Sequence, residues 1–353
     1  MCHLAGYIGD RNCIPIILES LELQEAIIGA QATGLATLKD RRINLQKTIG
    51  PIAYFRKKFK LKEEAEIGIG HTRHAIKNVK NAETNTVEKA HPFWNSDKSF
   101  VTMHNGTLTN YKQFVQDLES KGYEFRSRTE YKDKDSGEKV VDYCDSEIFS
   151  FLLEENLHKT DDIKEAIRVS CKDFQGQFAF VILHPYYPNQ IFIANWMQPI
   201  HVGCAHKSSY FCSFEIGFKA GKTLLPCRFK PPQNVLITLE RNNISVEQLL
   251  HHRSPPEFTP NSDEFTEIVL EALKNQQNDV AGIRIYIQNN SEKIGLTEDE
   301  FKEIATINGY TFSPIIYTYL RKLEKEKIIE RKLEYVWEGG IKETPRYKFY
   351  MKK

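Results

Sequence analysis

The sequence predicts a layered α+β domain over residues 1–250, followed by a smaller unit over residues 262–353. Short buried strands recur through the first part, and its helices occur at separate places along the chain, a pattern typical of an α+β domain. Residues 251–261 contain Ser-Pro-Pro at 254–256 and indicate a linker. The pattern beyond the linker is mainly helical, so we expect two domains.

The overall composition excludes several classes of function. The 353 residues include 48 basic and 47 acidic side chains, so the net charge of +1 gives no reason to expect a nucleic-acid or membrane surface. There is no signal-peptide pattern and no apolar run long enough to span a membrane. The seven cysteines form no CxxC pair, which favours a reducing compartment over disulfides or a zinc site. We therefore expect a cytoplasmic protein without a metal or other cofactor.

Apolar segments and turn residues assign the elements of the first part. The predicted strands cover residues 3–8, 34–38, 99–103, 178–183, 190–194, 199–203, 210–213, 235–239 and 244–246. The predicted helices cover residues 14–24, 56–66, 107–122, 148–157 and 161–172. The charged residues 126–142 are interpreted as a surface insertion.

The second part resembles a winged helix. Helices are predicted over residues 262–276, 297–308 and 313–327, followed by a strand pair at 328–332 and 347–350 around a turn at 338–340. Acidic and basic residues are nearly balanced in this part, which argues against DNA binding and favours a solvated face or a protein contact. Nucleic-acid binding remains a hypothesis for this unit alone.

The N-terminus carries the first candidate catalytic group. Removal of Met1 would leave Cys2 with both a thiol and a free α-amine. A thiolate is a strong nucleophile, and an α-amine with a pKa of about 7.7–8.0 can act as a general base near neutral pH. Met-Cys is also an ordinary chain start, and an N-terminal cysteine can be a lipid attachment site. Catalysis therefore needs support from elsewhere in the sequence.

Three further segments contain residues suited to a catalytic site. The strand end at 67–73 terminates in Arg73, whose planar guanidinium can grip a carboxylate. Asn105-Gly106 is predicted at a strand-to-helix junction, which can aim a side-chain amide and a backbone N–H at one oxyanion. Asp145 precedes a helix, where it has either a binding role or an ordinary N-cap role.

Taken together and in order, these segments resemble a known family. They are Cys2 with Gly6 soon after, Gly-His-Thr-Arg at 70–73, Ala-His-Pro at 90–92, His-Asn-Gly at 104–106 and Asp-Ser-Glu at 145–147. The set is similar to class II glutamine amidotransferases, which are N-terminal-nucleophile hydrolases, and is most similar to the glutaminase domains of glucosamine-6-phosphate synthases. The resemblance covers about residues 2–250 and implies a four-layer αββα sandwich.

The resemblance implies a role for each matched residue. Cys2 would attack the side-chain amide of L-glutamine, and its own α-amine would pass the proton to the leaving ammonia. The Asn105 side chain and the Gly106 N–H would hold the oxyanion. Arg73 would bind the α-carboxylate of glutamine, and Asp145 would pair with its α-ammonium group.

The sequence also departs from the family pattern. His74 follows Arg73 where an aromatic residue or leucine is usual, and we expect His74 and Ala75 to complete the glutamine site. The insertion at 126–142 is longer than the resemblance implies. Three histidines of the matched motifs are interpreted as structural or hydrogen-bonding side chains: His71, His91 and His104.

Three hypotheses of function follow. The first is a glutaminase that passes ammonia to a separate synthase subunit, because the tail of roughly 90 residues is too small to be a synthase. The second is a glutamine-sensing regulatory protein that uses the winged-helix-like tail for protein or DNA contact. The third is an amide hydrolase of the same fold with another substrate. The presence of both Arg73 and Asp145 argues against it, because these two residues suit an α-amino acid. The oligomeric state stays open.

Overall fold

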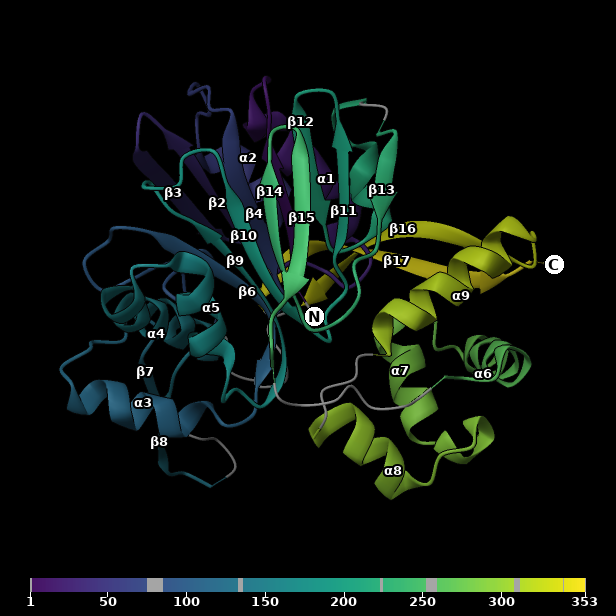
Figure 1. The fold of residues 1–353 in the computed structure, drawn as a ribbon. Helices are drawn as coiled ribbons and strands as arrows, with labels where there is room; N and C mark the ends of the chain where they lie inside the picture. The colour runs from purple at the N-terminus through teal and green to yellow at the C-terminus, as the bar shows by residue number, and fades with distance from the viewer. Residues whose placement is uncertain are drawn as a thin grey trace.

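The computed structural model describes residues 2–74, 85–132, 136–222, 225–251, 259–307, 312–338 and 340–352 (Figure 1). Among these residues, none of the helices combines the length and the apolar character needed to cross a membrane. The chain forms two large antiparallel sheets, helices on their outer faces, and a C-terminal unit of helices and a long hairpin.

Two sheets form the body of the first part. Successive side chains along each strand point to opposite faces of its sheet. Within the described residues, one sheet has the strand order β13-β11-β12-β1-β4-β2-β3 and the other has the order β15-β14-β10-β9-β6-β5. The strands of the first sheet are β1 (His3–Ile8), β2 (Ala32–Lys39), β3 (Arg42–Ile49), β4 (Ile67–Arg73), β11 (His201–Ala205), β12 (Ser208–Cys212) and β13 (Cys227–Phe229). Those of the second are β5 (Phe93–Trp94), β6 (Val101–Leu108), β9 (Gly176–Leu183), β10 (Ile191–Trp196), β14 (Val235–Glu240) and β15 (Asn243–Gln248).

Three apolar layers hold this body together. On β1, Leu4 and Ile8 point between the sheets, whereas Ala5 and Tyr7 point to the outer face, as the two-residue period of a strand requires. Helices α1 (Cys13–Glu25) and α2 (Ile52–Lys58) cover that outer face. Helices α3 (Tyr111–Ser120), α4 (Asp145–Thr160) and α5 (Ile163–Cys171) lie on the other sheet. The result is a helix–sheet–sheet–helix sandwich, in agreement with the predicted layers.

Several predicted elements differ from the structure. The helix expected at 56–66 is wrong: α2 ends at Lys58, because the buried side chains of Ile52 and Phe55 fix its position and Phe59 is extended. Strand β3 was not predicted, since it lies at a sheet edge and most of its residues are polar or only partly buried. Asn105-Gly106 lies inside β6, which continues to Leu108, and not at a strand-to-helix junction.

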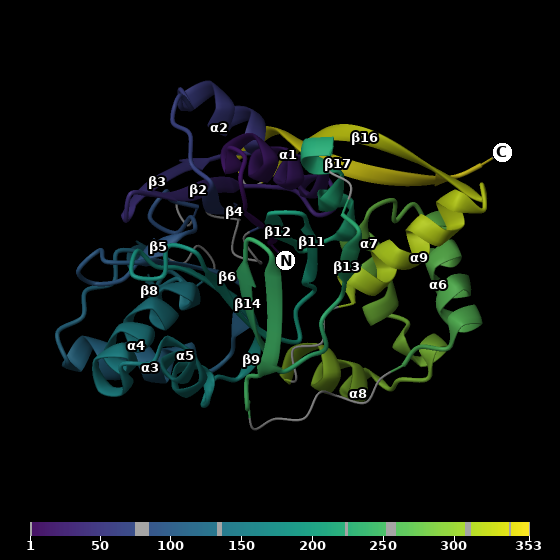
Figure 2. The same cartoon turned by 45° about the horizontal axis from the view of Figure 1, so that its top comes forward.

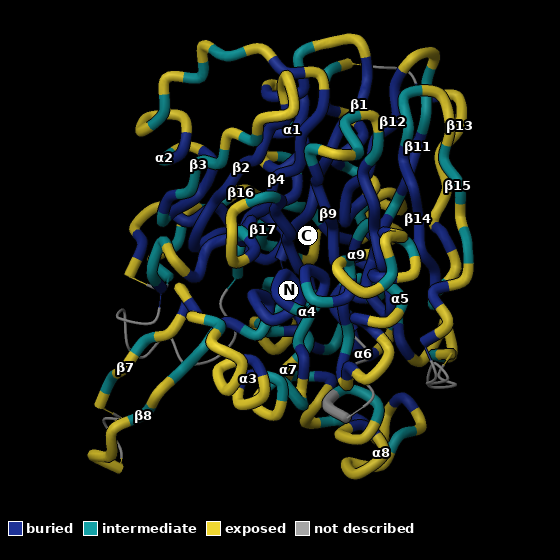
Figure 3. The backbone as a smooth tube through the Cα atoms, turned by 60° about the vertical axis from the view of Figure 1, so that its left-hand side comes forward, coloured by how far each residue is buried: buried dark blue, intermediate teal, exposed yellow. Residues whose placement is uncertain are grey.

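The charged insertion forms a small hairpin of its own. Strands β7 (Thr129–Lys132) and β8 (Lys139–Asp142) pair with each other and with neither large sheet. This hairpin projects from the body and is largely exposed (Figure 3). The prediction of a surface excursion at 126–142 is therefore confirmed for the described residues.

The C-terminal unit, defined as α6 to β17, places helices before a long hairpin. Its helices are α6 (Ser262–Lys274), α7 (Val280–Gln288), η3 (Ser291–Ile294), α8 (Glu298–Lys302), η4 (Glu303–Ile307) and α9 (Ser313–Lys325). Strands β16 (Ile329–Glu338) and β17 (Ile341–Met351) form the hairpin. Helix α7 was missed because its residues, VAGIRIYIQ, combine a glycine with β-branched residues that favour strands.

The C-terminal unit packs directly on the sandwich. Ile27, Ile28 and Phe214 of the sandwich share one apolar cluster with the helices of the unit. The rings of Phe214 and Tyr317 lie 5.5 Å apart in an edge-on arrangement. The hairpin runs from α9 across to α1 (Figure 2), so the two parts share a buried interface.

Candidate active site

Cys2 directly precedes β1, a central strand of the first sheet, and is 8% exposed. Its backbone N–H donates a hydrogen bond to Oδ1 of Asn105, 3.0 Å away. Its Sγ accepts from the backbone N–H of His74 at 3.5 Å. The next residue, His3, is anchored by a 2.9 Å hydrogen bond between its Nδ1 and Oγ1 of Thr72. The fold therefore brings the nucleophile candidate into contact with residues 72 and 103 positions further along the chain.

Asn105 lies on β6 of the second sheet, and its side chain is fully buried. Because Oδ1 is engaged with Cys2, Nδ2 is the group that remains to donate. Among the described residues Nδ2 has no hydrogen-bond partner. A buried amide donor without a partner is costly, and such a group is expected to have a ligand in a working site.

Gly106 occupies a backbone position that only glycine fits. Its φ angle is +145°, and a Cβ atom there would lie 2.0 Å from the carbonyl oxygen of Gln177 on β9. The same atom would lie 2.6 Å from Nε2 of His104. The glycine therefore allows β6 to pair closely with β9 while Asn105 is presented to Cys2.

The three motif histidines form a buried core behind this site. Nε2 of His71 is 3.0 Å from the carbonyl oxygen of His104, and Nδ1 of His104 is 2.8 Å from Oγ of Ser146. The rings of His71 and His91 stack with centroids 4.0 Å apart. Burial lowers the pKa of His71 to about 3, so this histidine is neutral near pH 7. The hydrogen bonds and stacking agree with the structural interpretation of these side chains.

Arg73 ends β4 and is partly exposed. Its Nη1 donates to Oδ1 of Asn85 at 3.2 Å, and Nδ2 of Asn85 donates to the carbonyl oxygen of Gln31 at 3.0 Å. Asn85 was not predicted, because no sequence signal marks a residue that acts by holding another side chain. His74 follows Arg73 and contacts Cys2, whereas Ala75 lies outside the described residues.

Asp145 is the first residue of α4, and its carboxylate does not cap that helix. Cys144 occupies the N-cap position and makes no side-chain capping bond. Oδ2 of Asp145 instead accepts from the backbone N–H of Leu108 at 2.7 Å, and Oδ1 accepts from the hydroxyl of Ser146 at 3.2 Å. The carboxylate is thus tied to β6, three residues after Asn105, and remains partly exposed.

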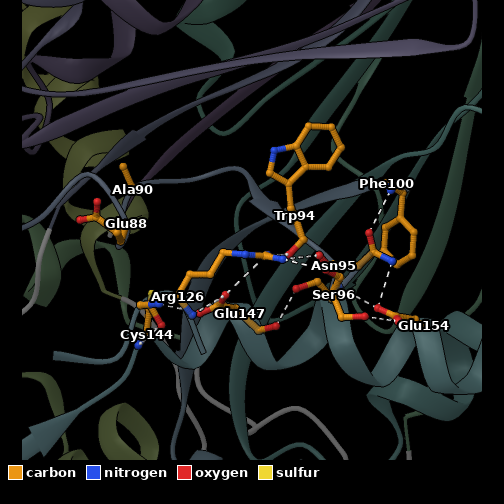
Figure 4. A network of polar contacts seen from close by, with 12 residues as sticks. Glu88, Ala90, Trp94, Asn95, Ser96, Phe100, Arg126, Cys144, Glu147 and Glu154 are labelled. Atoms are coloured by element: carbon orange, nitrogen blue, oxygen red, sulfur yellow. Dashed lines mark hydrogen bonds and ion pairs between the residues drawn. The ribbon is translucent and has the colours of Figure 1, made fainter. Parts of the chain in front are cut away.

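A polar network holds the start of α4 in place (Figure 4). The buried carboxylate of Glu147 accepts from the backbone N–H groups of Arg126, at 3.2 Å, and Ser127, at 2.9 Å. Burial raises the pKa of Glu147, and these hydrogen bonds oppose that shift. The Arg126 guanidinium donates to the carbonyl oxygens of Trp94, Asn95 and Ser96. The network links the segment after β5 to the turn that carries Asp145.

The structure thus places the predicted site residues in two groups. Cys2, Asn105 and His74 are in direct contact. Arg73 contacts Asn85, and Asp145 contacts Leu108 and Ser146, so the described contacts do not join Arg73 to Asp145. Among the described residues, no group of His, Cys, Asp or Glu is arranged to hold a metal ion. The arrangement offers a nucleophile, a free amide donor, a cation and a carboxylate.

Comparison with known sequences identifies the family of this site. Residues 71–215 match a family model described as a glutamine amidotransferase domain. The glutamine–fructose-6-phosphate aminotransferase (isomerizing) of Pyrococcus horikoshii is 32% identical over 214 residues, which cover 60% of this chain and 32% of that protein. The enzyme of the same name from Helicobacter pylori strain J99 is 33% identical over 215 residues, with the same coverage. The chain therefore spans about a third of the length of these curated relatives.

Solved structures agree on the fold. A glutamine phosphoribosylpyrophosphate amidotransferase from B. subtilis, complexed with ADP and GMP, matches with a TM-score of 0.55 and 18% identity over 74% of this chain and 50% of its own. A structure described as the allosteric regulatory enzyme of purine biosynthesis matches with a TM-score of 0.59 and 17% identity, over 78% of this chain and 58% of its own. At these identities the two structures show a shared fold and nothing about function. The family match over residues 71–215 and the curated relatives together show that the chain contains a class II glutamine amidotransferase domain.

Proposed function

We propose that this domain hydrolyses the side-chain amide of L-glutamine through a thioester on Cys2. The observation that carries the proposal is the contact between the Cys2 nitrogen and Oδ1 of Asn105, which leaves the buried Nδ2 of Asn105 without a partner among the described residues. This arrangement puts a nucleophile, a base and an oxyanion donor within one site.

The reaction proceeds in two stages. Once Met1 has been removed, the Cys2 thiol adds to the amide carbon of glutamine, and its proton passes to the Cys2 α-amine. Asn105 Nδ2 and the Gly106 N–H stabilise the oxyanion. The ammonium group then protonates the leaving nitrogen, which departs as ammonia and leaves a thioester. Water hydrolyses the thioester to glutamate and restores the thiol.

The amino-acid end of glutamine is recognised by charge. Arg73 binds the α-carboxylate through its guanidinium, with Asn85 holding the side chain in place. Asp145 pairs with the α-ammonium group and is itself oriented by the Leu108 N–H. His74 borders the substrate through its contact with the Cys2 sulfur. The role expected for Ala75 rests on the sequence alone, because this residue lies outside the described ones.

We further propose a division into residues 1–250, a linker at 251–261 and a winged-helix-like domain at 262–353. The order of helices before a hairpin supports this assignment. Ammonia would pass to a separate acceptor subunit in the cytoplasm. The glutamine-sensing alternative and DNA binding are not favoured, because the relatives are enzymes and the charges of the tail are nearly balanced.

The direct test is release of glutamate from glutamine by the purified full chain. Wild-type protein should release glutamate and ammonia in equal amounts, and Cys2→Ala should abolish the reaction. The matched control is Cys227→Ala, because Cys227 is exposed and lies on β13. Full activity in Cys2→Ala, or none in a wild-type protein shown to lack Met1, would contradict the proposal.

A further inference from the structure

The hairpin of the C-terminal unit contacts the sandwich at α2 and at the end of α1. The backbone N–H of Tyr347 on β17 donates to the carbonyl oxygen of Ala26, just after α1, at 2.6 Å. Near the hairpin tip, the hydroxyl of Tyr54 on α2 donates to the carbonyl oxygen of Lys342 at 3.0 Å. These two contacts anchor the hairpin to the sandwich along the direction seen in Figure 2.

Between these two contacts lies an ion pair whose arginine is buried and whose glutamate is partly exposed. Arg346 is 3% exposed, and its guanidinium donates to the carboxylate of Glu338 on the opposite strand. Gly29 lies against the pair: a Cβ atom there would approach Nη2 of Arg346 to 2.8 Å and Oε2 of Glu338 to 3.0 Å. Gly29 has φ +102°, so both its backbone and the space around it require glycine. The pair is therefore built into the interface.

The interface is joined to the residues that flank Cys2. Two residues after Gly29, the backbone N–H of Gln31 donates to the carbonyl oxygen of Arg73 at 2.8 Å. The rings of His3 and Phe214 lie 5.8 Å apart, and Phe214 in turn contacts Tyr317 of the C-terminal unit. Burial is the main reason that the pKa values of His3 and His74 lie well below their ordinary range, and the nearby charge of Arg346 adds to both shifts. The neutral state of these rings is consistent with a fixed cation beside them. His3 follows Cys2 directly, and His74 donates its backbone N–H to the Cys2 sulfur.

Several polar atoms at this junction lack partners among the described residues. They are Nε of Arg346, Oγ1 of Thr344, Nε2 of His3 and Nδ1 of His74. Thr344 is fully buried and lies two residues before Arg346 on β17, so both side chains share one face of the strand. Buried polar atoms without partners are costly, so Arg346 and Thr344 are unusual side chains for the buried face of the hairpin.

We propose that Arg346 is a positioning residue for the Cys2 site: paired with Glu338, it holds the C-terminal hairpin against Gly29, and the segment from Gly29 to Gln31 holds the end of β4 at Arg73 and His74. The C-terminal unit is then part of the glutaminase site and not a separately acting module. Loss of the pair loosens His74, which removes the backbone donor from the Cys2 sulfur and displaces the preceding Arg73. This inference rests on the proposed glutaminase function.

The test compares two substitutions on the same strand. Arg346→Met removes the cation at the interface, whereas Lys348→Met removes an ion pair with Asp279 that lies inside the C-terminal unit. Arg346→Met should lower kcat/KM for glutamine about 10- to 100-fold, the size expected when a catalytic group is displaced by about 1 Å. Lys348→Met should stay within about threefold of wild type, since surface or partly buried pairs contribute little. Arg346→Lys should restore part of the loss because it keeps the charge but not the planar guanidinium.

A second readout does not depend on glutamine turnover. Iodoacetamide should alkylate Cys2 faster in Arg346→Met than in Lys348→Met, because the buried thiol becomes accessible when His74 loosens. If Arg346→Met fails to fold, Glu338→Gln removes the same ion pair. The kcat/KM and the alkylation rate of that variant then test the proposal. Wild-type kcat/KM and alkylation in the folded interface variants would overturn the proposal. A wild-type protein without glutaminase activity, but with the alkylation difference intact, would refute the proposed function and leave the positioning role standing.

Discussion

The two ends of the candidate site are held by different kinds of structure. Cys2 directly precedes β1, and Asn105 and Gly106 lie in β6; the positions of both strands follow from hydrogen-bonded pairing with neighbouring strands. Arg73 and Asp145 lie where β4 ends and α4 begins, and side-chain networks hold them through Asn85 and Leu108. The amide end is thus fixed by sheet register, and the amino-acid end by polar contacts.

This difference predicts which kinetic parameter depends on the amide end of the site and which on the amino-acid end. A donor fixed by strand pairing needs little reorganisation as charge develops, so it stabilises the transition state and supports kcat. Groups that bind the unreacting end of the substrate contribute to both ground and transition states, so their loss appears mainly in KM. The predictions below test that separation, from the largest expected effect to the smallest.

Asn105→Ala should lower kcat by about 10²–10³, with little change in KM, because it removes one oxyanion donor. Steady-state glutaminase kinetics measure both parameters. The matched control is Asn195→Ala, since Asn195 is also buried and pairs with Ala179, the same residue that pairs with Asn105 from the other side. An equal loss in both variants would mean that burial of an amide, and not its position beside Cys2, explains the effect.

Gly106→Ala should destabilise the fold by about 3 kcal/mol, because the new methyl group meets the Gln177 carbonyl oxygen and the backbone conformation is strained. Urea unfolding monitored by fluorescence gives this value. Gly122→Ala is the control: Gly122 also has a positive φ, but nothing lies within 4 Å of its added Cβ. Similar losses in both variants would show that the close approach of β6 to β9 does not explain the destabilisation.

Arg73→Lys should raise KM for glutamine about 10- to 100-fold, while kcat changes much less, because lysine cannot form a two-pronged contact with a carboxylate. Arg128→Lys, at an exposed arginine outside the site, should leave both parameters unchanged. A fall in kcat without a rise in KM would contradict the division of the site into a reacting and a recognising end.

The buried histidine core predicts a pH dependence of stability. The folded state keeps His71 neutral because burial lowers its pKa to about 3, whereas the unfolded chain protonates it near 6.5. The unfolded state therefore binds more protons below pH 6.5, and stability falls as the pH decreases toward 3. Between pH 7 and 5, wild type should lose about 2 kcal/mol more than His71→Gln in urea unfolding. Equal losses would show that His71 does not remain neutral.

The sequence predicted the parts of the fold whose local pattern agrees with their burial. Strand β1 was predicted with its observed bounds, because a strand that is buried on both faces is a continuous apolar run with clear ends. Strand β3 and helix α7 were missed, since an edge strand with mixed polarity and a helix rich in β-branched residues both contradict simple periodicity. Tertiary packing decides such segments.

The same limit applies to the site. Ordered motifs predicted Cys2, Arg73, Asn105, Gly106 and Asp145, and the structure brings Cys2 and Asn105 into contact. Asn85 and Arg346 were not predicted. Asn85 contacts Arg73, and Arg346 is proposed to act from the far end of the chain, so neither has a local pattern.

Intact mass spectrometry before and after treatment with diazo-oxo-norleucine, a glutamine-like alkylator, tests the central claim most directly. The claim is that the free amine and thiol of Cys2 act together beside Asn105. It predicts protein lighter by one methionine, one adduct per chain on the Cys2 peptide, and loss of glutaminase activity in step with the adduct. Glutaminase activity in protein that retains Met1, or an inactivating adduct on another cysteine, would contradict it.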